Sequence, residues 1–330
     1  MPWKIIGHEW ASSLLAQHIA RGEMRHAYLF CGPPGVGRRT LALRFAQALN
    51  CTQPPAPGQP CGACLTCDQI ERMQHIDLSI ARTLEDASTI KVEQIRELQR
   101  SLALSPYSAR YRVALLLNFE QATASAQNAL LKTLEEAPEK VILLLTAGSP
   151  ENLLPTIVSR CEVMRLRPLA VDALQEALVD QKGVSPEQAR LLAHLSGGRP
   201  GDALRLQSED DLNKPRRRWL DELKRLLASR RLERFQTAES LSKDRDQLRQ
   251  VFLIWLSFWR DLLLLCAGSS APLTNLDYEV DLRAIAKQLD LAFARERTTD
   301  LEQAVAGLDA NLNPRLLAEV ILLDWPTLRI

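Results

Sequence analysis

Short, continuous apolar runs and longer amphipathic stretches alternate along the first half of the chain. The runs at 27–31, 111–117 and 141–145 are almost wholly apolar. Runs of this length are typical of central parallel strands that are covered on both faces. Between and around them, helical spacing of apolar residues marks the stretches 9–21, 39–49, 92–102 and 125–136. The alternation predicts an α/β domain over roughly the first 165 residues, with a parallel sheet and helices on both faces.

The strand signals end after Pro168, and the rest of the chain has helical spacing. Three short helices are expected first, at 171–181, 186–195 and 202–206, with glycines between them. A basic, polar stretch at 210–218 is expected to be a linker. Beyond it we expect helices at 219–227, 234–241, 247–266, 281–295, 300–308 and 314–322. The pattern therefore divides the chain into 1–167, 168–209 and an all-helical part at 210–330.

Composition excludes some broad classes of function. The chain has 330 residues, of which 25% are charged, and its formal net charge is +1, so no global charge draws it onto nucleic acid. The N-terminus lacks the apolar run of a signal peptide, so we expect a cytoplasmic protein. The apolar stretch 251–267 contains Arg260 and Asp261 and falls short of the ~20 apolar residues that a membrane span needs. We therefore expect a buried helix there, and no contact of the protein with a membrane.

A glycine-rich turn follows the first apolar run. Gly32, Gly35 and Gly37 stand at the spacing of a P-loop, between a predicted strand and a predicted helix. Backbone N–H groups of such a turn can face phosphate oxygens. The P-loop lysine is replaced by Arg38, however, and the metal-binding hydroxyl by Arg39, with Thr40 after it. A guanidinium has only donors and cannot bind Mg²⁺, so we expect a degenerate site without ATP hydrolysis, in which ATP binding is doubtful.

The second acidic element of a P-loop ATPase is also missing. The strand at 111–117 is followed by Asn118, Phe119 and Glu120 instead of a pair of acids. A lone Glu120 is expected to be a solvated turn residue. Two catalytic elements are therefore degenerate together. The alternative is an active ATPase in which Arg38 replaces the lysine, although its planar fork does not fit the role of a point charge.

Four of the seven cysteines lie close together in the sequence, namely Cys51, Cys61, Cys64 and Cys67. Two overlapping C-x-x-C steps and a fourth thiol across a Pro/Gly-rich loop fit a closed, tetrahedral and hence structural Zn²⁺ site. Reduced or redox-active thiols are the alternative. A zinc-dependent nucleic-acid-binding protein would be a different class, but the interleaved aromatic and basic residues typical of such modules are missing.

Two further motifs carry a resemblance to a known family. The segment 128–138 reads NALLKTLEEAP, and Ser159-Arg160-Cys161 follows later in the chain. Together with the cysteine quartet, which is that family's zinc module, they closely resemble the bacterial sliding-clamp loaders, the AAA+ subunits of DNA polymerase III. A degenerate P-loop with a retained Ser-Arg-Cys is similar to the delta-prime type. The gamma/tau motor type would keep the P-loop lysine and the acid pair.

The resemblance implies a five-stranded AAA+ module at 1–167 with the zinc module at 51–67, a lid at 168–209 and a collar domain at 210–330. It implies a hetero-pentamer with gamma/tau and delta subunits, and indirect contact with the sliding clamp and primer-template DNA. It assigns to Arg160 the role of an arginine finger that acts in trans on a neighbour's ATP. On the residues alone, a loop arginine paired with a carboxylate is the alternative.

Two positions near the lid and the sheet bear on the motor function. The motor subunits place a sensor arginine directly before the sequence Asp-Ala-Leu, where this chain has Gly201 before Asp202. Arg199 lies close by and could partly replace it. Thr146 stands where the family has a polar sensor residue at a strand end, and it is equally well explained as a strand-end hydroxyl.

Overall fold

The computed structural model describes residues 3–84, 87–208 and 213–328. The chain forms two compact units. Unit 1 consists of Met1–Ala170 with Arg199–Asp202, and unit 2 of Val171–Gly198 with Ala203–Ile330. The finer division into a lid at 168–209 and a collar at 210–330 stays a prediction.

Unit 1 contains a five-stranded parallel sheet in the order β2-β3-β4-β1-β5. The strands are β1 (Ala27–Cys31), β2 (Leu78–Ala81), β3 (Arg112–Leu116), β4 (Val141–Ala147) and β5 (Glu162–Arg165). The three strands expected from continuous apolar runs, β1, β3 and β4, are buried along their whole length. The predicted fold class is confirmed. The strands β2 and β5 are only partly buried, which explains why no continuous apolar run marks them.

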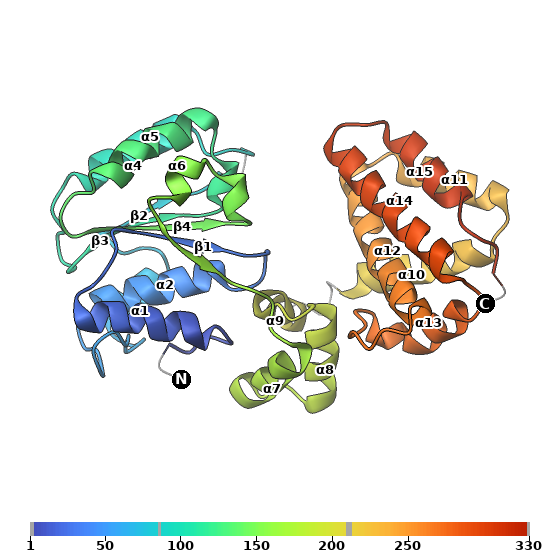
Figure 1. Ribbon diagram of the computed structural model, residues 1–330, viewed down its shortest axis with the longest axis horizontal. Helices are drawn as coiled ribbons and strands as arrows, with labels where there is room; N and C mark the ends of the chain where they lie inside the picture. Colours follow the sequence, from blue (N-terminus) through green and yellow to red (C-terminus); the bar gives the residue numbers. More distant parts are fainter. Residues whose placement is uncertain (1–2, 85–86, 209–212, 329–330) are drawn as a thin grey trace. The chain divides into compact units, whose positions relative to one another are not determined.

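Helices cover both faces of this sheet (Figure 1). On one side lie α1 (Glu9–Arg21) and α2 (Arg38–Asn50), and on the other α4 (Val92–Leu102), α5 (Ala124–Glu135) and α6 (Pro155–Val158). Successive strand residues point to opposite faces, so Tyr28 and Phe30 enter one core while Leu29 enters the other. The shorter elements are α3 (Leu65–Glu71), η1 (Phe119–Gln121) and η2 (Pro150–Asn152).

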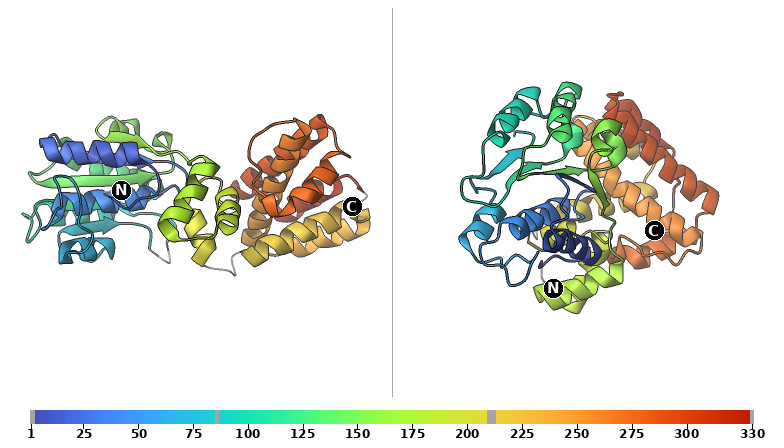
Figure 2. Two further views of the ribbon diagram at one scale, coloured as in Figure 1. Left: turned by 90° about the horizontal axis from the view of Figure 1, so that it is seen from below. Right: turned by 60° about the vertical axis from the view of Figure 1, so that its left-hand side comes forward.

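Unit 2 is helical throughout the residues described (Figure 2). Its helices are α7 (Val171–Lys182), α8 (Pro186–Leu195), α9 (Pro200–Ser208), α10 (Asn213–Ala228), α11 (Arg231–Leu241), α12 (Arg245–Cys266), η4 (Leu276–Tyr278), α13 (Glu279–Ala286), α14 (Leu291–Asp309) and α15 (Pro314–Leu323). The first residues of α9 belong to unit 1. Trp255, Phe258 and Trp259 of α12 form the centre of the unit's core.

The apolar stretch 251–267 is the buried helix that its sequence predicts. Asp261 is fully buried, and its carboxylate accepts hydrogen bonds from the backbone N–H groups of Thr274 and Asn275 at 3.0 and 2.7 Å. Bonds of this kind satisfy a buried carboxylate within the protein. Among the residues described, no helix has the length and apolar character required to cross a membrane.

Four expectations for the helical part were wrong, one of them the separation of 281–295 from 300–308, since α14 runs unbroken from Leu291 to Asp309. Residues 209–212 of the expected linker lie outside the described residues, and α10 already begins at Asn213 because its residues form an amphipathic helix over Leu220 and Leu223. The single helix expected at 281–295 is interrupted, since Asp290 caps a new helix, α14, by accepting from the Phe293 N–H. The third short helix begins at Pro200, which is favourable in a first turn, rather than at 202.

Candidate functional site

The expected phosphate-binding turn lies at the carboxyl end of β1, where it borders a cavity of about 430 Å³. Five of the six predicted residues line this cavity, namely Gly35, Gly37, Arg38, Arg39 and Thr40. Gly32 lies at the start of the turn, directly after β1. Sequence reasoning did not assign two further lining residues, Arg82 and Thr83, to the site. They follow β2, whose carboxyl end lies at the same edge of the sheet.

Arg38 faces the end of β3. Its Nη2 donates to Asn118 Oδ1 at 3.2 Å, and its Nη1 lies 3.9 Å from Glu120 Oε1. Burial lowers the pKa of the Arg38 guanidinium, while the charge of Glu120 acts in the opposite direction. An arginine remains protonated under such a shift. Arg38, at the position of the P-loop lysine, thus lies against Asn118 and Glu120, which stand in place of the acid pair. Its side chain is only 11% exposed.

Glu120 is not the solvated turn residue that we expected. Its side chain is 23% exposed, and Oε1 accepts a hydrogen bond from the Gly148 N–H at 3.0 Å. The adjacent Asn118 N–H donates to Thr146 Oγ1 at 2.8 Å. These two bonds join the residues after β3 to the end of β4. Glu120 is held inward because it serves both Gly148 and Arg38, and the hydroxyl of Thr146 caps a neighbouring backbone group.

The segment Arg199–Asp202 lies directly on the glycine turn. The Gly201 N–H donates to Gly35 O at 2.8 Å, and a Cβ added to Gly35 would lie 2.4 Å from Asp202 Cγ. Gly35 has φ +78°, so this position requires glycine for its backbone as well as for the close approach of Asp202. Arg199 pairs with Asp202 at 3.0 Å. The carboxylate of Asp202, paired with Arg199, thus lies directly beside the turn, and the Asp-Ala-Leu motif gave no indication of this contact with Gly35.

Arg160 lies elsewhere in unit 1, just after α6, with its side chain 34% exposed. Its Nη1 donates to Thr156 O at 2.9 Å, and its Nη2 donates to Glu135 Oε1 at 2.7 Å. Ser159 Oγ bonds to the same Thr156 carbonyl at 3.2 Å. The carboxylate pairing considered from the sequence is therefore present, and Glu135 is the residue that sequence reasoning did not single out.

The four clustered cysteines come together in space. Their Sγ atoms all lie within 4.8 Å of one another, with Cys51–Cys64 and Cys61–Cys67 at 4.0 Å. Tetrahedral thiolates about 2.3 Å from Zn²⁺ would lie about 3.8 Å apart, whereas a disulfide needs about 2.05 Å. The N–H groups of Ala63 and Cys64 lower the pKa of the Cys61 thiol. The donor set and its spacing fit a structural zinc ion.

A polar side chain of α2 supports this cysteine cluster. Gln47 is buried, and its Nε2 donates to the Cys67 carbonyl at 2.7 Å and to Glu71 at 3.0 Å. Arg44 pairs with the same Glu71 at 2.7 Å. These contacts hold α3, which carries Cys67, against the helix that begins at Arg38. A polar residue inside an otherwise apolar helix face was the sequence signal for Gln47.

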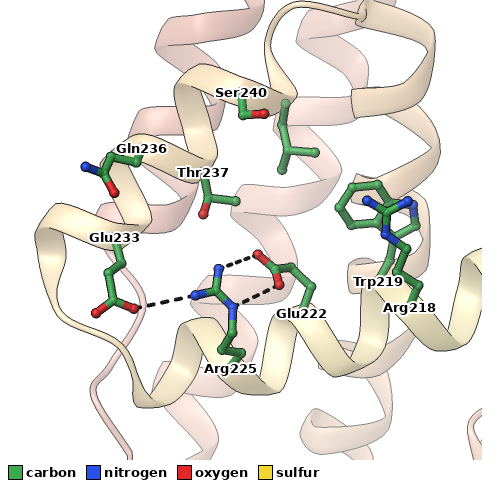
Figure 3. Close-up of a pocket in the computed structure, with 9 residues that line it drawn as sticks. Arg218, Trp219, Glu222, Arg225, Glu233, Gln236, Thr237 and Ser240 are labelled. Carbon is green, nitrogen blue, oxygen red and sulfur yellow. Dashed lines mark hydrogen bonds and ion pairs between the residues drawn. The ribbon is translucent and has the colours of Figure 1, made fainter.

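A second cavity, of about 370 Å³, lies between α10 and α11 in unit 2 (Figure 3). Arg225 crosses it, pairing with Glu222 at 2.6 Å and with Glu233 at 3.5 Å, and Arg218 stacks over Trp219 at 5.0 Å. Figure 3 shows both carboxylates directed at the Arg225 guanidinium. The lining contains two arginines and two glutamates and so carries no net charge, and we assign its ion pairs to the packing of α10 against α11.

Comparisons with known proteins agree with the sequence motifs. The family model "DNA polymerase III, delta subunit" matches residues 7–170, and "DNA polymerase III, delta subunit, C terminal" matches residues 210–327. The delta' subunit of DNA polymerase III from Pseudomonas aeruginosa is 32% identical, with 97% of this chain and 98% of that protein covered. The delta' subunit from Bacillus subtilis is 29% identical over 94% of this chain and 93% of that protein.

The chain is also similar to another subunit type. The tau subunit of DNA polymerase III from Escherichia coli is 35% identical over 210 residues, which are 62% of this chain but only 32% of tau. The relatives that match over nearly their full length are thus delta' subunits. In the tau alignment, more than a third of this chain and most of tau lie outside the match.

Proposed function

The chain belongs to the DNA polymerase III delta' family of clamp-loader subunits, and from this premise we propose that it is a non-catalytic subunit of the loader. In this proposal it assembles with gamma/tau motor subunits and a delta subunit in a hetero-pentamer. The complex loads the sliding clamp onto primed DNA by ATP hydrolysis, and this chain supplies one essential charge to that reaction.

The observation that carries the non-catalytic part is the internal neutralisation of the phosphate-binding turn. Arg38 bonds to Asn118 and lies beside Glu120, so the end of β3 offers no free acid pair for Mg²⁺. Asp202 places a carboxylate against Gly35, next to the N–H groups that would face a phosphate. Hydrolysis of ATP needs a metal, a phosphate cradle and a positioned water together. The absence of an acid pair at the end of β3 supports the proposal that this chain does not hydrolyse ATP by itself.

The charge that the chain supplies is that of Arg160. Its side chain is a third exposed and lies just after the short helix α6, where its contacts are with Thr156 and Glu135 rather than with the chain's own degenerate turn. In the assembled loader it reaches the γ-phosphate of ATP bound to a neighbouring motor subunit and stabilises the charge that develops there. A retained finger in a chain without its own ATP chemistry can serve only a neighbour.

The cysteine cluster holds Zn²⁺ in this proposal, through Cys51, Cys61, Cys64 and Cys67. When bound, the ion closes the loop 51–67 as a cross-link, since four thiolates leave no coordination position for a substrate. Gln47 and Glu71 then hold this loop on α2. The ion takes no part in phosphate chemistry. The lid at 168–209 and the collar at 210–330 are proposed to mediate assembly.

The test is ATP turnover by the purified chain, alone and after addition of motor subunits. We expect turnover above background only with motor subunits, and stimulation by clamp and primed DNA only in the complex. DNA-stimulated turnover by the chain alone would favour the active-ATPase alternative with Arg38 in the lysine role. An Arg38→Ala variant is the control, because it abolishes turnover that belongs to this chain and leaves that of a contaminant unchanged.

A further inference from the structure

Arg160 forms an ion pair with Glu135, and the Ser-Arg-Cys motif does not account for this contact. Glu135 is the last residue of α5, and Arg160 follows α6. We propose that Glu135 is a positioning residue, which holds the Arg160 guanidinium in the orientation needed by the neighbouring ATP site. This inference rests on the proposed function, because it concerns how the trans finger is presented.

The pair connects two elements whose separation is already set by the core. Ile157 of α6 and Leu130 of α5 are fully buried in the same apolar cluster, and the two helices contact each other (Figure 1). Gln127 of α5 accepts a hydrogen bond from the Leu154 N–H at 3.1 Å, which fixes the start of α6. The helix that carries Glu135 is therefore held against α6, and this places the Glu135 carboxylate beside Arg160.

The guanidinium is held on one side only. Nη1 bonds to Thr156 O and Nη2 to Glu135 Oε1, both contacts of its own subunit. A guanidinium has more N–H donors than these two bonds use, in one rigid plane. Fixing that plane from the protein side leaves the remaining donors for an anion of the neighbouring subunit. A carboxylate can orient a charged catalytic side chain in this way without reacting itself.

Stability does not explain the pair. Arg160 and Glu135 are 34% and 52% exposed, and ion pairs at such surfaces contribute little to folding. An arginine side chain without a partner samples many rotamers, and this freedom is lost when it engages a phosphate. A pre-oriented guanidinium avoids that loss at the step where the charge is needed. The effect of Glu135 should therefore appear in catalysis and not in the unfolding temperature.

The experiment uses the reconstituted loader with Glu135→Gln and, as matched control, Glu136→Gln. Glu136 is the next residue, is exposed, and among the described residues forms no ion pair with Arg160. At equal assembly, we expect Glu135→Gln to lower clamp- and primer-stimulated kcat about three- to tenfold at the site served. KM for ATP should stay unchanged, as should the unfolding temperature of the subunit. Glu136→Gln should behave as wild type.

A double-mutant cycle separates this inference from the proposed function. In an Arg160→Ala background, Glu135→Gln should have no further effect, because its action passes through Arg160. If Arg160→Ala itself leaves turnover unchanged, the finger proposal fails, and this inference fails with it. If Arg160→Ala lowers turnover but Glu135→Gln matches the Glu136→Gln control, only the positioning role is overturned. A higher kcat with Glu135→Gln also overturns it, since Glu135 would then be a competitor for the guanidinium.

Discussion

The two arginine regions of unit 1 differ in whether their charge is already used. At the degenerate turn, Arg38 is 11% exposed and lies against Asn118 and Glu120 of its own sheet. In the loop that follows α6, the Arg160 side chain is 34% exposed, and that of its partner Glu135 is 52% exposed. A partly exposed guanidinium remains accessible to a further anion, whereas a partly buried pair resists separation because it would leave a charge unpaired.

The two regions therefore differ in whether their arginine is accessible to another molecule. Beside the turn, Arg38, Asn118, Glu120, Thr146 and Gly148 form an internal network of contacts. Arg160 instead keeps N–H donors beyond its bonds to Thr156 and Glu135, and in the proposed function these donors bind a γ-phosphate of the neighbouring subunit. The proposed function, in which this subunit acts on a neighbour's ATP and not on its own, rests on this difference.

Arg160→Ala gives the largest expected effect and tests the finger side of the comparison. A cationic finger is worth roughly 10³–10⁵ in rate in other NTPases. We expect a loss of that order at the one ATP site that Arg160 serves, and a smaller loss in the total turnover of a loader with several sites. The measurement is clamp- and primer-stimulated ATPase and clamp loading by the reconstituted loader, at equal assembly.

The arginine-finger hypothesis is wrong if the Arg160→Ala complex assembles and loads clamps at the wild-type rate. Arg160→Lys is the companion variant, since it keeps the charge but loses the planar fork. We expect it to be intermediate if charge and geometry both matter. If the alanine variant does not assemble, Arg160→Lys supplies the test, because a finger predicts reduced turnover in a complex that still forms.

Removal of the zinc ligands tests whether the cysteine cluster serves the scaffold rather than the chemistry. Cys64→Ser should reduce the bound zinc from about one equivalent per chain and lower the free energy of unfolding by about 3 kcal/mol or more. Metal analysis of protein prepared without added zinc and denaturant unfolding are the measurements. Cys266→Ser is the control, because Cys266 lies on α12 outside the cluster. A fully folded native protein without metal would contradict the prediction.

The central strands of unit 1 could be predicted from the sequence because a strand that is buried on both faces consists of a continuous run of apolar residues. Strands β1, β3 and β4 are buried on both faces and appear as continuous apolar runs, while β2 and β5, at the sheet edges, carry no such signal. In the helical part, the break between α13 and α14 was missed. It depends on the cap made by Asp290, which a helical spacing of apolar residues does not reveal.

The candidate site was predictable where residues act through their place in a motif. The turn, the cysteine quartet and Arg160 were identified in this way, and the cysteines do come together in space. Asp202, Glu135 and the inward position of Glu120 were not predicted. Each depends on a contact between distant segments, such as Asp202 with Gly35, and such a contact leaves no mark on local spacing.

The buried pair of Asp77 and Arg112, unlike the pair of Arg160 and Glu135, contributes to stability. The pH dependence of the free energy of unfolding tests this contribution. Burial alone would raise the pKa of Asp77, but hydrogen bonds from the N–H groups of residues 107–109 and from Arg112 outweigh it and lower the pKa to about 2. The unfolded value is about 3.9, so the carboxylate contributes about 2–3 kcal/mol. This stability is present above pH ~4 and is lost as the pH falls towards ~2.

Asp77→Asn should therefore lower the free energy of unfolding by about 2–3 kcal/mol at pH 7, and the difference from wild type should shrink below pH ~4. Denaturant unfolding across this pH range is the measurement. Asp68→Asn is the matched control, since Asp68 pairs with Arg72 on an exposed helix face at 3.0 Å and should change stability little. An equal pH dependence for both variants would contradict the assignment.

Arg38→Lys gives the smallest expected effect and tests the turn side of the comparison. The variant restores the P-loop lysine, but Arg39 still occupies the metal-ligand position, the end of β3 still lacks an acid pair, and Asp202 still lies against Gly35. Catalytic groups that act as a unit are not additive, so restoring one of them should restore no rate. We expect no ATP turnover by the purified variant and, in the loader, stimulated turnover equal to wild type. The wild-type chain alone sets the background, and Arg38→Ala reports any change due only to loss of the contact with Asn118 and Glu120. DNA-stimulated turnover by Arg38→Lys above that background would show that the turn is a suppressed active site, and both regions would then be able to act on ATP.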